Sequence, residues 1–318
     1  MNSTTKKAIK IIIPLLLAVF FGWYTFSKLP VKEFIPYFEN ANYSWISLGV
    51  IFGILSHLSR AYRWKFTLEP LGYKPKLPNS IMAVFIAYLA NFGIPRSGEV
   101  LRAAVLTNYE DVPFEKGFGT IVAERFADLV MIFGLVAIAL YLKFDFIYNF
   151  FAEKLNPQTL IVVGIGFLMG STILVLFLKN SESKFAVKIR TFVIGLIEGV
   201  LSIFKMKQKW AFIFHTVFIW SMYVLMFYVT TFALPEISRL PFAAILIAFI
   251  SASFTIAATN GGVFVYPLAI GVAFSLFNIP EAPSIAFGWI IWTAQTLIII
   301  IMGSLSFIYL PIYNRKNN

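Results

Sequence analysis

The sequence contains no cysteine and only two histidines, His57 and His215. Without cysteine the chain has no disulfides, no thiolate metal sites and no thiol nucleophile, and two separate histidines do not form a metal-binding cluster. It also has no Walker-type phosphate loop and no G-x-S-x-G nucleophile motif. We therefore expect no metal, no cofactor and no enzymatic activity in this chain.

Charged residues and long hydrophilic stretches are scarce as well. Asp, Glu, Lys and Arg make up 13% of the 318 residues, whereas 59% are hydrophobic. No stretch between apolar runs is long enough for a soluble catalytic domain. This composition is far more apolar than that of a soluble domain and indicates a polytopic membrane protein.

Six apolar runs, all but one of them uncharged, have about the length needed to cross a bilayer as helices. A hydrocarbon core of about 30 Å takes roughly 20 helical residues to cross. The runs cover residues 11–27, 44–59, 119–142, 157–178, 210–232 and 284–310. Helices are expected because lipid leaves an unpaired backbone unsatisfied and no alternating strand pattern is present. The first run follows three lysines but lacks a small-residue cleavage site, so we interpret it as a retained helix.

The formal net charge of +11 comes from basic residues in short loops and not from one continuous stripe. This distribution does not favour nucleic acid as a partner. Lys and Arg accumulate on the cytoplasmic side of short loops. The basic regions are the N-terminus, residues 60–79, residues 179–209 and the C-terminus. We therefore expect an integral protein of a bacterial-type cytoplasmic (inner) membrane, with both termini in the cytoplasm.

Two apolar segments, 81–108 and 242–277, are interrupted by polar, glycine and proline residues. If the basic regions 60–79 and 179–209 are both cytoplasmic, the chain crosses the membrane an even number of times between them. Three apolar segments lie there, 81–108, 119–142 and 157–178, so one of them does not cross. The first segment, broken by "NFGIPRSGEV", is the one expected to re-enter from the cytoplasm. Broken by "AATNGGVFVYP", the second either re-enters from outside or crosses twice. The alternative for both is that glycine and proline merely kink ordinary helices.

Together these segments predict an all-α fold with an inverted repeat. Each half would contain three crossings and one re-entrant or interrupted helix. The halves are residues 1–156 and 157–318, with an amphipathic interfacial connector at about 184–205. Gly/Pro-interrupted segments at corresponding positions of two halves indicate a transporter-type binding site. We expect the hinges or gates to be Gly93, Pro95, Gly98, Asn260, Gly261 and Gly262.

Charged residues at or inside the apolar boundaries form three clusters. Five arginines face three carboxylates, which leaves two positive charges and favours an anionic ligand. Arginine grips phosphate oxygens with two hydrogen bonds and stays protonated when partly desolvated. The predicted substrate-binding residues are Arg60, Arg63, Asn91, Arg96, Glu99, Arg102, Glu124, Arg125 and Asp128.

Each cluster also has a structural interpretation. Arg60 and Arg63, beside a tryptophan, are also typical of membrane-interface anchors. The cluster from Glu124 to Asp128 would serve to neutralise the arginines of the first interrupted segment. His57 and His215 are most simply packing residues.

Three motifs resemble the flippase-like transmembrane domain of the lysylphosphatidylglycerol synthase family. They are "SRAYRW" at 59–64, "NFGIPRSGEVLRA" at 91–103 and "ERFADL" at 124–129. The resemblance covers essentially the whole chain and implies movement of a phospholipid across the membrane. The family's soluble aminoacyl-transferring domain has no counterpart here, so synthesis is not implied. The second-half motif reads Asn-Gly-Gly-Val-Phe where relatives tend to have Pro-Gly-Gly-x-Gly, so the substrate need not be the same.

We expect a flippase or transporter of an anionic phospholipid or lipid-linked substrate, with membrane lipids as its partners. Two alternatives stay open, a carrier of a small soluble anion and an accessory subunit that presents a lipid to a separate enzyme. The direction, the energy source and the oligomeric state are not readable from the residues.

Overall fold

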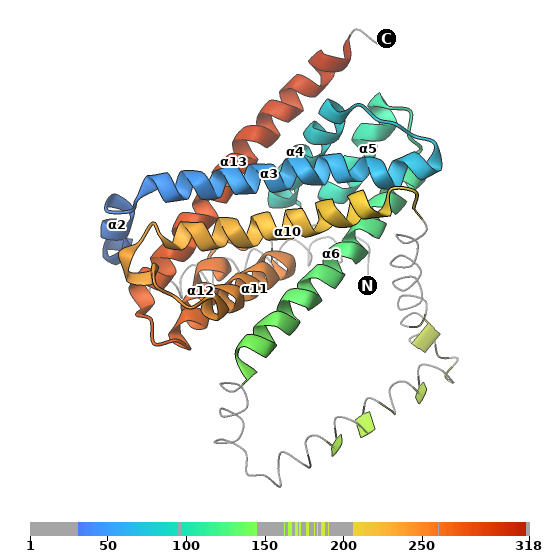
Figure 1. Ribbon diagram of the computed structural model, residues 1–318. Coiled ribbons are helices and arrows are strands. Elements are labelled where there is room, and N and C mark those ends of the chain that lie inside the picture. Colours follow the sequence, from blue (N-terminus) through green and yellow to red (C-terminus); the bar gives the residue numbers. More distant parts are fainter. Residues whose placement is uncertain are drawn as a thin grey trace, which may run out of the picture.

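The computed structural model describes residues 31–94, 97–144, 206–259 and 261–315, with single positions between 162 and 190 (Figure 1). Every regular element in these ranges is a helix, as the sequence predicts. The helices are α2 (Val31–Glu39), α3 (Tyr43–Leu68), α4 (Leu77–Gly93), α5 (Ser97–Tyr109), α6 (Phe114–Leu142), α10 (Lys209–Thr231), α11 (Phe242–Ala258), α12 (Val265–Ser275) and α13 (Glu281–Asn314).

Three of these helices, α6, α10 and α13, are long and apolar enough to cross a membrane. A fourth span results if α2 and α3, which meet at a bend of 86°, are counted as one. These helices contain four of the six expected crossing runs, which confirms a polytopic all-helical membrane protein. The runs 11–27 and 157–178 and the connector at 184–205 lie wholly or largely outside the described residues.

Helices α3 and α10 pack against each other in antiparallel directions along most of their length (Figure 1). α3 begins where the Asn42 side chain accepts a hydrogen bond from the Ser44 N–H at 3.1 Å, which satisfies a free donor of the first turn. Near this end Gly49 lies directly against Thr230 of α10, where a Cβ atom would collide. At the other end the Ser59 hydroxyl is 2.8 Å from His215 Nδ1.

The first interrupted segment forms a hairpin of two short helices, α4 and α5. The side chain of Asn91, near the end of α4, accepts a hydrogen bond at 2.8 Å from the N–H of Gly98 in the first turn of α5. At the base of the hairpin, Asn79 donates to the carboxylate of Glu110. The chain thus reverses where the sequence predicts an interruption. Pro95 and Arg96 lie outside the described residues.

The second interrupted segment also reverses, through α11 and α12. Gly261 and Gly262 have φ angles of +74° and +73°, which glycine adopts without steric cost. The N–H of Gly262 donates to the Thr259 hydroxyl at 3.1 Å, which closes the turn. Both glycines therefore form a turn between helices and not a kink within one. Asn260 lies outside the described residues.

The two hairpins meet at their tips and share α13 as a neighbour. A Cβ atom on Gly261 would lie 2.7 Å from the ring of Phe92 at the end of α4. Trp292 of α13 donates to the Gly261 carbonyl at 2.8 Å. Further along α13, Gly303 packs against Leu89 of α4. One long helix thus contacts both interrupted segments.

Candidate functional site

Helices α3 and α6 bring two arginines and two carboxylates together in the interior. Arg60 and Arg63 are three residues apart on α3, and Glu124 and Asp128 are four apart on α6, so each pair lies on one helix face. The Asp128 carboxylate is 2.5 Å from Arg60 Nη1 and 3.0 Å from Arg63 Nη1. All four residues are buried. The burial of Arg60 and Arg63 is inconsistent with exposed interface anchors.

Glu124 connects α3 to the first hairpin. One of its oxygens is 3.4 Å from Arg63 Nε and the other is 2.8 Å from Arg102 Nη1 of α5. Arg102 also stacks on the Trp64 ring, with its Cζ 3.9 Å from the ring centroid. The Trp64 indole N–H in turn donates to the Thr120 hydroxyl of α6 at 2.9 Å. The network therefore fixes the direction of the Arg102 side chain from two sides.

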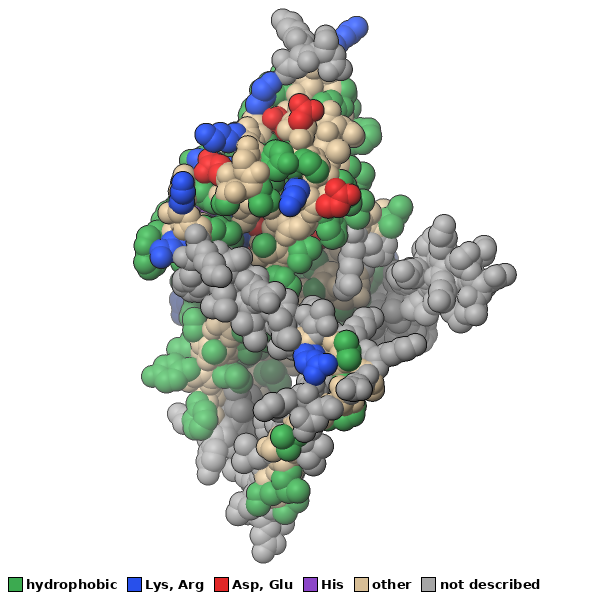
Figure 2. All heavy atoms as spheres, turned by 90° about the vertical axis from the view of Figure 1, so that its right-hand side faces the viewer, with side chains coloured by type: hydrophobic (Ala, Val, Ile, Leu, Met, Phe, Trp, Pro, Cys, Tyr) green, Lys and Arg blue, Asp and Glu red, His purple; other side chains and the backbone are tan. Residues whose placement is uncertain are grey.

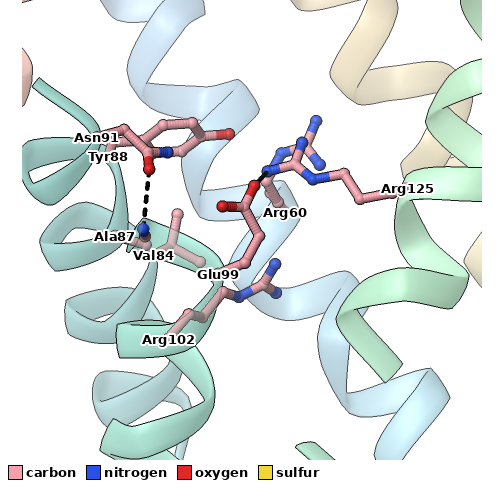
Figure 3. A pocket seen from close by; sticks show the side chains of 9 residues that line it. Arg60, Val84, Ala87, Tyr88, Asn91, Glu99, Arg102 and Arg125 are labelled. Atoms are coloured by element: carbon pink, nitrogen blue, oxygen red, sulfur yellow. Dashed lines mark hydrogen bonds and ion pairs between the residues drawn. The ribbon is translucent and has the colours of Figure 1, made fainter. Parts of the chain in front are cut away.

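Arg60 and Arg102 of this network also line a cleft, here named the charged cleft, between α3, α4, α5 and α6 (Figure 3). The cleft is partly open to its surroundings. Its lining residues are Arg60, Val84, Ala87, Tyr88, Asn91, Gly98, Glu99, Arg102 and Arg125. At its rim Arg125 Nη2 donates to Glu99 Oε1 at 2.8 Å, and these two side chains are 44% and 24% exposed. The rim pair is thus accessible, whereas the arginines deeper in the cleft are not.

Several buried donors in the charged cleft are unused. Arg102 Nε and Nη2 and Arg60 Nε have no hydrogen-bond partner among the residues that the structure describes. Arg102 as a whole is only 4% exposed. Leaving buried guanidinium N–H groups unpaired is costly, so such groups are normally satisfied by water or a ligand. The cleft is therefore suited to an anion with several oxygens, such as phosphate.

The predicted substrate-binding residues divide into two groups. Five line the charged cleft, namely Arg60, Asn91, Glu99, Arg102 and Arg125, and the predicted hinge Gly98 lines it as well. Three do not line it but belong to the ion-pair network that holds Arg60 and Arg102: Arg63, Glu124 and Asp128. Gly93 is the last residue of α4 and does not line the cleft, and Gly261 and Gly262 belong to the second hairpin. Arg96, Pro95 and Asn260 lie outside the described residues.

Four residues near the site were not predicted. Tyr88 lines the cleft, and its hydroxyl is 3.4 Å from that of Tyr223 on α10. Thr216 of α10 accepts from Arg63 Nη1 at 2.9 Å, and the Trp220 indole N–H lies 3.4 Å from Asp128. All four occur in apolar runs, where one polar atom gives no signal in the sequence. Their positions connect α10 to the charge network.

The motifs at 59–64, 91–103 and 124–129 contribute the charged residues of this site, and they point to a known family. The family described as lysylphosphatidylglycerol synthase TM region matches residues 11–303. The chain belongs to this family. It is 24% identical over 322 aligned residues to UPF0104 membrane protein MJ1595 of Methanocaldococcus jannaschii, which covers 89% of this chain and 88% of that protein. The resemblance read from the motifs is thereby confirmed.

A second relative is similar to this chain over only part of both proteins. Glycosyltransferase AglD of Haloferax volcanii is 29% identical over 110 residues, which is 34% of this chain and 18% of that protein. No solved structure matches the chain.

Proposed function

We propose that the chain moves an anionic phospholipid, or another lipid with a phosphate headgroup, across the cytoplasmic membrane. The observation that carries the proposal is the charged cleft, in which a buried arginine on a short hairpin presents unused donors. Charged groups inside a membrane protein are costly and typically mark a substrate pathway. Acyl chains would stay in the bilayer while the headgroup occupies the cleft. The family match and both relatives favour a function connected with membrane lipids.

The proposal includes the inverted repeat expected from the sequence. The corresponding units are α3 followed by the hairpin α4–α5, and α10 followed by the hairpin α11–α12. Their antiparallel direction supports this pairing, as does the position of the hairpins toward opposite ends of the α3–α10 pair (Figure 1). Transporters of this type place the substrate where two such hairpins meet. The contact between Phe92 and Gly261 lies at that point.

One other function has specific support. The partial similarity to a glycosyltransferase favours an accessory membrane unit that presents a lipid to a separate enzyme. Such a unit would hold the same headgroup in the same cleft without moving it. A purified chain that binds lipid but does not translocate it would support this function instead.

The test is lipid translocation in vesicles that contain the purified protein and a fluorescent phosphatidylglycerol. Arg102→Gln removes the charge and leaves a shorter polar side chain, so we expect at least a tenfold slower translocation. Arg102→Lys keeps the charge but loses the two-pronged geometry of the guanidinium group. Its translocation rate should therefore lie between those of the wild type and Arg102→Gln. Exposed Arg239, in the loop between α10 and α11, offers the matched control Arg239→Gln, which should behave like the wild type. Unchanged translocation in a folded Arg102→Gln protein would refute the assignment.

A further inference from the structure

Two hydrogen-bond donors and one acceptor in the charged cleft have no hydrogen-bond partner among the described residues. Arg102 presents Nε and Nη2, as described above. Glu99 uses Oε1 for Arg125, while its Oε2 is buried and accepts no hydrogen bond from the residues that the structure describes. Figure 3 shows the Glu99 carboxylate pointing toward Arg125, with Arg102 extending from the same helix, α5. A matching ligand therefore carries acceptor oxygens next to a hydrogen-bond donor.

The charge balance restricts what this donor is. The described residues of the cleft and of the adjoining ion-pair network include four arginines and three carboxylates. Each of the three carboxylates is already ion-paired. The arginines are Arg60, Arg63, Arg102 and Arg125. An ammonium group would enter a site that already has excess positive charge, whereas a hydroxyl brings a donor without charge.

From these observations we infer that the cleft recognises a phosphate group bearing neutral hydroxyls, and that Glu99 is the residue that selects for them. Arg102 Nε and Nη2 donate to phosphate oxygens, and Glu99 Oε2 accepts from a hydroxyl of the same headgroup. A headgroup with a cationic amine is disfavoured, so the substrate class differs from the aminoacylated lipid after which the family is named. The inference rests on the proposed function and makes it more specific.

The experiment is competitive lipid binding to the purified chain, measured by native mass spectrometry with three lipids of equal acyl chains. Phosphatidylglycerol carries phosphate and hydroxyls, phosphatidic acid lacks the hydroxyls, and lysyl-phosphatidylglycerol adds amines. We expect phosphatidylglycerol to bind at least about tenfold more tightly than either of the others, because a buried acceptor without a donor disfavours the analogue that lacks it. Equal binding of phosphatidylglycerol and phosphatidic acid, or tighter binding of the lysyl lipid, would overturn the inference.

Variants of Glu99 separate selection from folding. Glu99→Ala removes the acceptor, and the preference for phosphatidylglycerol over phosphatidic acid should fall to within about twofold. Glu99→Gln retains a carbonyl acceptor and should keep most of that preference while discriminating more strongly against the lysyl lipid. Exposed Glu115, at the start of α6, offers the matched control Glu115→Ala, which should keep the wild-type order. A Glu99→Ala protein with the full preference would contradict the role of Glu99.

Two further arms identify which statement fails. Glycerol phosphate serves as a soluble competitor and should displace phosphatidylglycerol only at far higher concentration. Displacement at equal concentration would point to a soluble anion as the ligand and overturn the proposed lipid function, while the chemistry of the cleft would stand. Conversely, lipid translocation that occurs without any preference for hydroxyls would leave the proposed function intact and refute this inference alone.

Discussion

Asp128 orients two arginines at once without lining the charged cleft itself. Its two oxygens contact Arg60 and Arg63, which lie on the same face of α3. Arg60 lines the cleft, so its position there depends on the Asp128 carboxylate, which does not line the cleft. Removing one member of a buried ion pair leaves an uncompensated charge in a medium of low dielectric constant, which costs much more than the pair contributes. Asp128 is therefore required for the shape of the site.

This role predicts a large loss of stability in Asp128→Asn. The amide has nearly the same size but leaves Arg60 and Arg63 with Glu124 as their remaining buried counter-charge. We expect a loss of about 3–5 kcal/mol in the free energy of unfolding, measured by denaturant titration in detergent. The control is Asp111→Asn, since Asp111 is exposed and its φ of 53° is one that asparagine tolerates. Equal stability of the two variants would show that the buried pairs contribute little.

At this scale the sequence predicted which residues gather but not which of them pair. Helical spacing places Glu124 and Asp128 on one face, yet it carries no information about the neighbouring helix. Neutralisation of the hairpin arginines was predicted for this cluster, and Glu124 does contact Arg102. Asp128 instead neutralises the arginines of α3. Long-range contacts of this kind depend on how helices pack, which a single sequence does not state.

The two hairpins are made possible by glycines at points where backbones approach closely. Gly98 lies so near the Ala87 carbonyl oxygen of α4 that a Cβ atom would overlap with it. Close packing at this position lets Asn91 reach the Gly98 N–H and close the hairpin. Gly93, two residues further along α4, has open space around its Cα. The two glycines of one motif therefore have different roles.

The difference yields a matched pair of substitutions. Gly98→Ala forces the hairpin helices apart and should cost about 1–3 kcal/mol in the free energy of unfolding. Gly93→Ala meets no neighbour within 4 Å and should be neutral or stabilise by up to about 1 kcal/mol, because alanine is the better helix former. Thermal unfolding of both variants in the same detergent provides the comparison. Similar unfolding temperatures would show that α4 and α5 are not closely packed.

Both interruptions were predicted as breaks in apolar runs, and the chain reverses at each of them. The choice for residues 242–277, between re-entry and two crossings, depends on a membrane position that the helices alone do not give. The contact between Phe92 and Gly261 was not predicted, because the residues are far apart in the sequence and neither is polar. Glycine and proline patterns thus locate the turns, whereas packing determines where the tips meet.

The ends of the whole molecule differ in basic character. The end with the C-termini of α3 and α13 carries seven described basic residues, and the opposite end carries three. The first set is Lys65, Lys74, Lys76, Lys116, Lys207, Lys209 and Arg315, and the second is Lys32, Lys143 and Arg239. Figure 2 shows charged side chains gathered in the upper part of the face that it presents. By the positive-inside rule, we predict that the first end faces the cytoplasm.

Single cysteines in this cysteine-free chain test the orientation directly. Lys74→Cys and Lys116→Cys flank the hairpin α4–α5 and should react with a membrane-impermeant maleimide only after the membrane is opened. Arg239→Cys and Glu281→Cys lie at the opposite end and should react in intact cells, because the proposed inverted repeat places that end outside. The hairpin helices of 17 and 13 residues span about 25 and 20 Å at 1.5 Å per residue, which is less than the hydrocarbon core. Reaction of Lys116→Cys from outside would place α4–α5 across the membrane and refute the inverted repeat.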